Sequence, residues 1–382
     1  MATHRKNGGQ PEYVARKPLS ITPEGKLLFQ ADLEARGAQL ALSLTTLETS
    51  LQQKLTTARI KPDPNYNLGV LGMGLFKKDE ILDNVSRLTE FGQNVIQAEM
   101  NYCEEHMAEL GLTKKPKAAK STRVTIEPVV IPPWKANVKR IKLAVKNTVL
   151  FCENTTDAVT KNAATWRIAN VHNVFAGRGF KVVSLTGTDD VRPNFLVEAK
   201  KPYVVYIGGI GHGSPTLYTG NLGDHLLDVG MYDPAEVKGK SMHFLSCKTA
   251  QQLGPNVITK GARAYGGYYQ NFTFVWDVAG TAVNEEVLFY QSDGTFDQKM
   301  ALGFTVEQAA NATIAAFNAA RLLPGIPGTA AATWLTWDRD WFRSPVANVI
   351  YGDKLATISP YTYVWIPIPL SVSELEAELE KA

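Results

Sequence analysis

Apolar side chains recur at helical spacing in the first part of the chain. Leu33, Leu40, Leu44, Leu47, Leu51 and Leu55 follow one another at intervals of three, four and seven residues, which places them along one face of a helix. Thr22 followed by Pro23 and Glu24 is typical of a helix start. Residues 61–64, Lys-Pro-Asp-Pro, are expected to end this helical stripe.

A second helical pattern follows a glycine-rich connector. The connector is residues 68–74, and the apolar positions after it run from Ile81 to Cys103. Two amphipathic helices joined in this way pack antiparallel. We therefore expect residues 1–110 to form a helical hairpin, which either braces the main domain or provides a surface for assembly.

The pattern changes again after residue 110. Residues 111–139 are rich in Lys, Pro and Ala with little periodicity, which predicts a linker. Beyond it, strand-like and helix-like segments alternate with short connections. The expected strands are residues 141–145, 148–152, 180–185, 203–207 and 242–246, and the expected helices are residues 157–175 and 253–260. This alternation predicts an α/β domain over residues 140–382, with a parallel sheet between two layers of helices.

The chain ends in an extension of unusual composition. Residues 361–370 are apolar and rich in proline, and residues 371–382 have the pattern of a short acidic helix. An apolar segment of this kind is atypical of a free tail and adds to the case for assembly.

Composition narrows the classes of function. The 382 residues are 45% hydrophobic and 20% charged with a formal net charge of +3, which is typical of a globular protein and gives no support for nucleic-acid binding. No apolar run is long enough to span a membrane, and the first ten residues lack the apolar core of a signal peptide. We therefore expect a cytoplasmic protein.

The cysteines and histidines do not predict a metal site. The three cysteines are Cys103, Cys152 and Cys247, which are too few and too scattered for a disulfide framework or a zinc site. Glycine-rich residues 208–213 lack the Gly-Lys-Ser/Thr ending of a phosphate-binding loop, so nucleotide binding is a weaker alternative. No cofactor is expected.

Two predicted strands end on reactive side chains. The strand at residues 203–207 leads into His212, and the strand at residues 242–246 leads into Cys247. Neighbouring parallel strands bring their carboxyl ends to the same edge of a sheet. The imidazole and the thiol are therefore expected to lie close together, as nucleophilic catalysis requires.

The chemistry of such a pair can be stated from the residues. A free thiol has a pKa of about 8.5 and needs a base at neutral pH, and His212 is the expected general acid and base. The N–H groups of Gly213 and Cys247 are candidates for an oxyanion hole. The competing interpretation is a loop histidine and a small buried cysteine without a role in chemistry.

These segments resemble the caspase-fold cysteine peptidases, in particular the gingipain-like and clostripain-like branch. The likeness lies in residues 211–214, Gly-His-Gly-Ser, in the pair Ser246 and Cys247, and in residues 261–268 and 349–353. It covers about residues 140–356. It implies a caspase-like sheet and a cysteine endopeptidase acting on protein or peptide substrates through His212 and Cys247, with no third catalytic residue identified.

The resemblance also suggests residues that contact the substrate. Asp157 lies where gingipain-like enzymes carry an acid for basic P1 side chains, and Glu153 is an alternative. Asp157 is equally well explained as the acid at a helix N-terminus. Asp277, Trp276 and Tyr268 are further candidates for the pocket. Clostripain-like enzymes carry an aspartate two residues before the nucleophile, where this chain has Leu245, so a preference for arginine is less strongly implied.

A second class of function stays open from the sequence. A catalytically silent protein of the same fold could keep both reactive residues and act as a scaffold or homo-oligomer through its N-terminal helices. His243, four residues before Cys247, is expected to pack within its strand or against a helix.

Overall fold

The computed structural model describes residues 11–36, 43–113, 140–276, 284–342 and 350–367, and its centre is a six-stranded sheet. The strands lie in the order β7-β6-β8-β11-β12-β14. All neighbours are parallel except β14, which is an antiparallel edge strand. The bounds are β6 (Thr148–Glu153), β7 (Lys181–Thr186), β8 (Val204–Ile210), β11 (Ser241–Leu245), β12 (Ala264–Gly266) and β14 (Tyr351–Gly352). The predicted α/β class and its mostly parallel sheet are confirmed.

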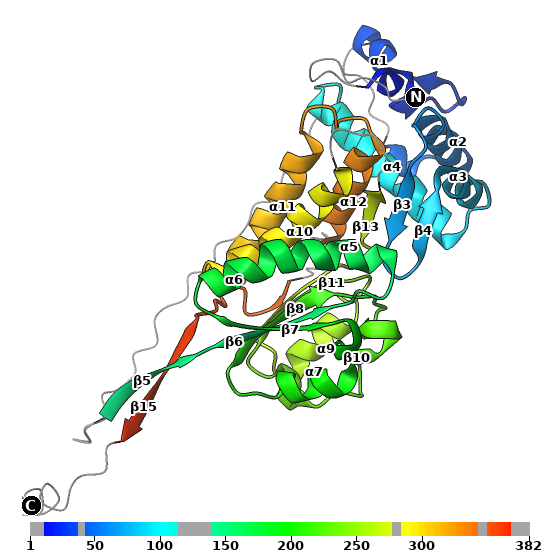
Figure 1. Ribbon diagram of the computed structural model, residues 1–382. Helices are drawn as coiled ribbons and strands as arrows, with labels where there is room; N and C mark the ends of the chain where they lie inside the picture. The colour runs from blue at the N-terminus through cyan, green and yellow to red at the C-terminus, as the bar shows by residue number, and fades with distance from the viewer. Residues whose placement is uncertain (1–10, 37–42, 114–139, 277–283, 343–349, 368–382) are drawn as a thin grey trace, which may run out of the picture.

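Helices cover both faces of this sheet (Figure 1). Side chains of β6 alternate between two apolar cores, with Val149 and Phe151 in one and Leu150 and Cys152 in the other, as the two-residue period of a strand requires. The first face carries α5 (Ala158–Arg167), a π-helical turn η3 (Ile168–His172), α6 (Asn173–Gly177) and α10 (Glu285–Ala301); the second carries α7 (Arg192–Ala199), α8 (Pro234–Val237) and α9 (Leu253–Thr259). The predicted helices 157–175 and 253–260 are thus both present.

The N-terminal region differs from the expected helical hairpin. The leucine stripe is not one helix, because α1 (Gln30–Arg36) is followed by a short 3-10 turn, η2 (Leu44–Thr46), and by α2 (Thr49–Ile60). The helix does end at Ile60, before the two prolines, as predicted. The second run is divided between α3 (Lys78–Ser86) and α4 (Glu90–Glu109). The region opens with a 3-10 turn, η1 (Glu12–Arg16), and a small hairpin of β1 (Ser20–Ile21) and β2 (Leu27–Leu28).

The glycine-rich connector is a β-hairpin and not a loop between helices. It consists of β3 (Asn67–Val70) and β4 (Gly74–Lys77), joined by a turn at Leu71, Gly72 and Met73. Strand β3 also pairs antiparallel with β13 (Thr273–Trp276), which lies just after the central sheet in sequence. The N-terminal region therefore contributes strands to the same body as the α/β domain.

Helix α4 is docked on the C-terminal helices α11 (Val306–Arg321) and α12 (Ala330–Phe342). The guanidinium of Arg321 donates to Glu105 of α4 at 2.7 Å, and that of Arg339 donates to the same carboxylate at 2.8 Å. Both arginines are largely buried. These contacts correspond to the bracing role considered for the N-terminal helices.

Two further strand pairs lie outside the central sheet. Strands β9 (Leu217–Thr219) and β10 (His225–Asp228) form a hairpin after His212. Strand β5 (Arg140–Lys146) pairs with β15 (Tyr361–Pro367), so part of the apolar C-terminal segment forms a two-stranded ribbon that projects from the body (Figure 1). Most of the predicted linker, the acidic helix at 371–382 and Asp277 lie outside the described residues.

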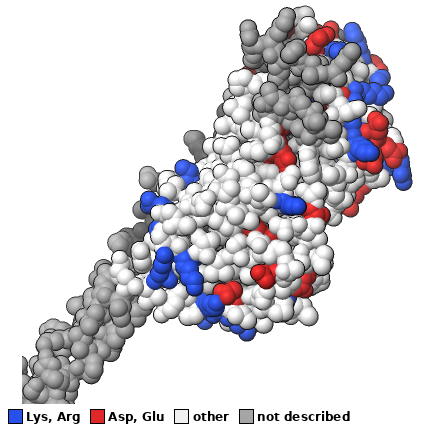
Figure 2. Space-filling model, viewed as in Figure 1, with Lys and Arg blue, Asp and Glu red and all other residues white. Residues whose placement is uncertain are grey.

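Acidic and basic side chains are interspersed over the described part of the face in Figure 2. Within the described ranges, every helix is too short or too polar to cross a lipid bilayer.

A buried acid on the second face predicts a pH dependence of stability. Asp190 is wholly buried next to Cys152, and burial together with the Glu153 carboxylate raises its pKa from 3.8 to about 8. Between these values unfolding releases a proton, so the free energy of unfolding falls as pH rises, by up to about 1.4 kcal/mol per pH unit. Asp190→Asn removes this loss. We expect the melting temperature of this variant, relative to that of the wild type, to increase from pH 5 to pH 8. A difference in melting temperature that stays constant over that range would contradict the prediction.

Candidate active site

His212 and Cys247 lie just beyond the carboxyl ends of two adjacent strands. Strands β8 and β11 are paired in parallel, with Ile210 opposite Leu245, so the predicted neighbourhood of the two strands is confirmed. The two loops that follow are in close contact. A Cβ placed on Gly213 would lie 2.6 Å from the Cys247 carbonyl oxygen and 2.2 Å from Ser246 Oγ. Only glycine allows this approach.

Cys247 is enclosed and held as a neutral thiol. Its side chain is 1% exposed, and its Sγ donates a hydrogen bond to the Leu71 carbonyl oxygen at 2.6 Å. Burial raises the pKa of the thiol well above its ordinary value. The next residue, Lys248, has a left-handed backbone with φ of 58°, a conformation that is costly for a residue with a side chain. Such strain next to a reactive group occurs at functional sites in other folds.

The imidazole of His212 uses both of its nitrogens. Nδ1 accepts a hydrogen bond from the Gly72 backbone N–H at 2.8 Å. Nε2 lies 2.6 Å from the Asp157 carboxylate. An N–H donates to Nδ1, so that nitrogen carries no proton, and Nε2–H is the donor to Asp157. The tautomer is therefore the one in which Nδ1 is available as a base.

Asp157 contacts both His212 and the N-terminus of α5, and the second contact confirms the sequence alternative of an acid at a helix N-terminus. One carboxylate oxygen caps α5 by accepting from the N–H groups of Val159 and Thr160 at 2.9 and 3.0 Å, and the other contacts His212. Partial burial opposes ionisation, but the His212 hydrogen bond and the two amides hold the pKa of Asp157 below its ordinary value. One oxygen of the Asp157 carboxylate is thus bound by the helix and the other by the histidine.

The Asp157–His212 pair spans the point where the strand order reverses. Strand β6 leads to Asp157, β8 leads to His212, and β7 lies on the other side of β6. In open α/β sheets the crevice for ligands lies at such a reversal. Asp157, His212 and Cys247 therefore follow three neighbouring strands, β6, β8 and β11.

The turn of the β3–β4 hairpin occupies the site. Leu71 contributes the carbonyl that accepts from Cys247, and Gly72 contributes the amide that donates to His212. These two groups belong to one peptide bond. The side chain of Leu71 is wholly buried, and Gly72 takes a φ of +80° that favours glycine. Sequence reasoning missed this contact, although the glycine-rich run at 68–74 marked the segment as unusual.

The proposed oxyanion donors are only partly arranged. Gly213 is paired with Tyr218 in a β-bridge. The hydrogen bonds of this bridge run between the flanking residues, from the Ser214 N–H to the Leu217 carbonyl and from the Thr219 N–H to the His212 carbonyl. The Gly213 N–H thus lies outside this ladder. Neither it nor the Cys247 N–H donates to the Leu71 carbonyl, which instead accepts from the thiol.

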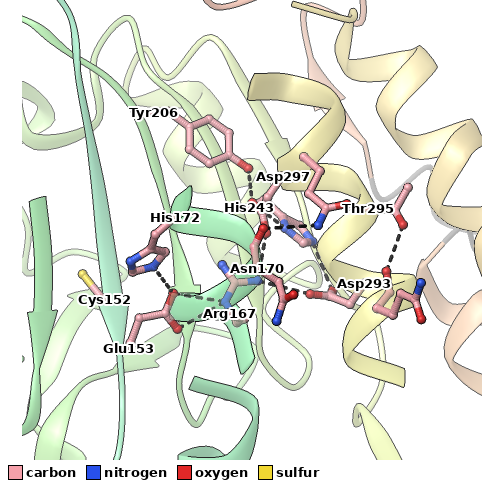
Figure 3. Close-up of polar contacts among 12 residues, drawn as sticks. Cys152, Glu153, Arg167, Asn170, His172, Tyr206, His243, Asp293, Thr295 and Asp297 are labelled. Atoms are coloured by element: carbon pink, nitrogen blue, oxygen red, sulfur yellow. Dashed lines mark hydrogen bonds and ion pairs between the residues drawn. The ribbon is translucent and has the colours of Figure 1, made fainter. Parts of the chain in front are cut away.

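Glu153 lies in a buried ionic network and not in a substrate pocket. It is wholly buried, and its carboxylate contacts the Arg167 guanidinium at 3.2 Å and His172 at 2.9 Å. Arg167 also donates to Asp297 at 2.8 Å and to Asp293 at 3.4 Å (Figure 3). The prediction that Glu153 contacts substrate is therefore not supported by its position.

His243 and Tyr268 belong to the same network. His243 lies 3.2 Å from Asp297 and 3.4 Å from Asp293, and Tyr268 donates to Asp293 at 2.8 Å. Tyr268 is buried in the core and does not line a pocket. His243, Asp293 and Asp297 have the donor atoms of a metal site, but Arg167 already supplies a positive charge to both carboxylates, which disfavours a cation there. The expected packing of His243 within its strand and against a helix is observed.

Of the last two predicted pocket residues, Trp276 and Asp277, the structure describes only Trp276. Trp276 is the last residue of β13 and is paired with Asn67 of β3. It therefore lies along the strand that holds the hairpin and not at the ends of β8 and β11, where His212 and Cys247 follow. Asp277 is outside the described residues.

Comparisons with protein-family models, curated proteins and solved structures find no match to this chain.

Proposed function

We propose that the protein is a cysteine endopeptidase of the caspase-like type, in which Cys247 is the nucleophile, His212 the general acid and base, and Asp157 the residue that positions His212. The observation that carries the proposal is the engagement of a single peptide bond by both reactive residues. The carbonyl side meets Cys247 and the nitrogen side meets His212. These are the two groups of a peptide bond on which acyl transfer acts, the carbonyl that the thiol attacks and the nitrogen that leaves with a proton.

We propose the following order of steps. His212 Nδ1 takes the thiol proton, and Sγ attacks the carbonyl carbon. His212 then donates that proton to the leaving nitrogen, and the acyl group remains on Cys247 as a thioester. Asp157 accepts from Nε2–H throughout and stabilises the imidazolium that forms. The Gly213 N–H is the proposed donor to the developing oxyanion.

The preferred P1 side chain in this proposal is aliphatic. Leu71 precedes the engaged bond and is wholly buried, whereas Glu153 and Asp157, the acids considered for a basic P1 residue, are bound to Arg167 and His212. A pocket that encloses leucine gains about 1.5 to 3 kcal/mol from burying it. A basic side chain would lose its hydration there without a partner.

While the hairpin is bound, the proposed enzyme cannot act on other peptides. Cys247 is 1% exposed and both nitrogens of His212 are engaged, so substrate from solution cannot reach the dyad. This is a latent peptidase, which distinguishes it from the catalytically silent scaffold that the sequence also allowed.

The test uses a variant in which the turn is expelled from the site. Leu71→Asp with Gly72→Pro, called the displaced variant below, introduces a charge that cannot stay buried and a proline that cannot adopt a φ of +80°. Its circular dichroism and melting temperature establish that it folds. We expect it to hydrolyse acetyl-leucine reporter amides at least about tenfold faster than those of arginine, lysine or aspartate, since one misplaced polar group costs about 1.4 kcal/mol or more. A folded variant that hydrolyses none of the four would contradict the proposal.

A change at Asp157 tests its positioning role. In Asp157→Asn the amide oxygen can still cap α5, which leaves the NH2 group facing His212 Nε2 and favours the wrong tautomer. We expect kcat of the displaced variant to fall by about 10² to 10⁴, with KM and melting temperature nearly unchanged. A merely structural role for Asp157 would instead lower the melting temperature and leave kcat within a few-fold.

A further inference from the structure

One peptide bond of the chain itself is held by the dyad, and we propose that the protein cuts its own backbone between Leu71 and Gly72. This inference rests on the peptidase function proposed above and names its first substrate. The cut converts the latent form described here into two chains, residues 1–71 and 72–382.

The distances suit reaction at this bond. Cys247 Sγ lies 2.6 Å from the Leu71 carbonyl oxygen, and a carbonyl carbon is about 1.2 Å from its oxygen, so Sγ is within about 3.8 Å of the carbon that it must attack. His212 Nδ1 lies 2.8 Å from the Gly72 nitrogen, the atom that must leave with a proton. A turn that only covered the site would need neither contact.

The residues before the bond are bound as a strand. From Asn67 to Val70 the hairpin pairs antiparallel with β13, in the register Val70 opposite Thr273 and Leu68 opposite Val275. The pairing continues to the edge of the dyad, because the Leu71 N–H donates to the Phe272 carbonyl at 3.1 Å. Strand addition of this kind is a general way to bind an extended peptide. It fixes the position of Leu71 relative to Cys247.

The side chains of this strand define the class of peptide that fits. Leu68, Val70 and Leu71 are all wholly buried. Between them, a Cβ on Gly69 would lie 2.4 Å from the buried ring of Phe274, so the third position before the cut accepts only glycine. The site therefore selects an extended Leu-Gly-Val-Leu segment followed by glycine.

The reaction is balanced with water as the only co-reactant. The thiol proton passes to His212 as the bond from Sγ to the Leu71 carbonyl carbon forms. The bond to the Gly72 nitrogen then breaks, His212 returns the proton, and Gly72 becomes a free amine. Water, deprotonated by His212, hydrolyses the thioester to the Leu71 carboxylate and regenerates the thiol. Met73, next in the turn, is 48% exposed, so solvent lies beside the bond.

The consequence is release of the dyad. Before the cut, Gly72 is tethered to Leu71 and engages His212 from within the turn. After it, the new amine is free to leave, and His212 and Cys247 become available to other peptides of the same pattern once residues 67–71 have also left β13.

The experiment is a time course of intact mass, measured under denaturing conditions on purified full-length protein in reducing buffer. We expect conversion to residues 1–71 and 72–382, with Gly72 as the new N-terminus, at a rate that does not change with protein concentration. Cys247→Ala and Gly72→Pro are expected to stay whole at this bond. Gly230→Pro is the matched control, because Gly230 is exposed and has a φ of +90°, and it should be cut as fast as the wild type.

The outcomes separate this inference from the proposed function. A wild-type chain that stays whole overturns self-cleavage. If the displaced variant still hydrolyses acetyl-leucine amides, the hairpin is an inhibitor and the peptidase proposal stands; if it does not, both fall. Cleavage that slows in proportion on dilution also overturns the inference, because the hairpin would then be cut by another molecule.

Discussion

Replacing Cys247 by alanine in the displaced variant is expected to abolish hydrolysis of acetyl-leucine reporters, with a loss in kcat of about 10⁴ or more. The loss is this large because the thiolate forms the bond to the acyl group. Initial rates at saturating substrate measure the effect. Serine at the same position is expected to be nearly as inactive, since the imidazole would have to deprotonate a much weaker acid.

A matched cysteine change controls for packing. Cys103 is likewise wholly buried, on α4, and Cys103→Ala removes the same atom from the core without touching the dyad. Its activity should stay within about twofold of the parent, within the additivity error for distant sites. Residual activity of Cys247→Ala within tenfold of the parent would show that the hydrolysis comes from another group.

Replacing Arg167 by methionine is expected to lower the free energy of unfolding by about 3 to 5 kcal/mol. The guanidinium is wholly buried and contacts Glu153, Asp293 and Asp297. Burial raises the pKa of Asp293, while Arg167 and His243 outweigh burial at Asp297 and lower its pKa. Without the guanidinium, His172 and His243 are the only groups in contact with these carboxylates that can carry a positive charge, and part of the carboxylate charge must be removed by protonation at a cost.

Urea unfolding measures this difference, and an exposed pair supplies the control. Arg87 and Asp83 are 3.3 Å apart with side chains 69% and 58% exposed, so Arg87→Met should change the free energy of unfolding by less than about 0.5 kcal/mol. An Arg167→Met effect as small as that of Arg87→Met would mean that the network contributes nothing to stability.

The sequence predicted the sheet because its strands are short apolar runs that end in glycine, polar or reactive residues. Residues 148–152 and 242–246 are buried on both faces, and they lead to Asp157 and to Cys247 respectively. The contact between the loops that carry His212 and Cys247 followed from strand adjacency alone. The N-cap role of Asp157 was also visible, because it precedes a helical pattern.

The sequence could not predict which partners the buried acids would find. Glu153 and Asp157 are four residues apart, yet one faces Arg167 in the core and the other faces His212 at the edge of the sheet. That difference depends on where β6 ends and α5 begins, and on helices more than a hundred residues away. Burial of Tyr268 against Asp293 depends on α10 in the same way.

The hairpin was missed for a related reason. Residues 68–74 alternate glycine with aliphatic side chains, which is compatible with a loop or a strand, and only pairing with β13 makes the segment a strand. The contact between Gly72 and His212 joins residues 140 apart in the chain. No periodicity carries information over that distance.

The most direct test of the site is to identify the residue that reacts with an acetyl-leucine chloromethyl ketone in the displaced variant. Peptide mapping should place the adduct on Cys247, with Cys103 and Cys152 unmodified, and His212→Ala should slow its formation by about 10² or more, within the range of general acid–base catalysis. An adduct distributed among the three cysteines, or a reaction at Cys247 that does not depend on His212, would contradict the assignment of a catalytic Cys247 and His212 pair.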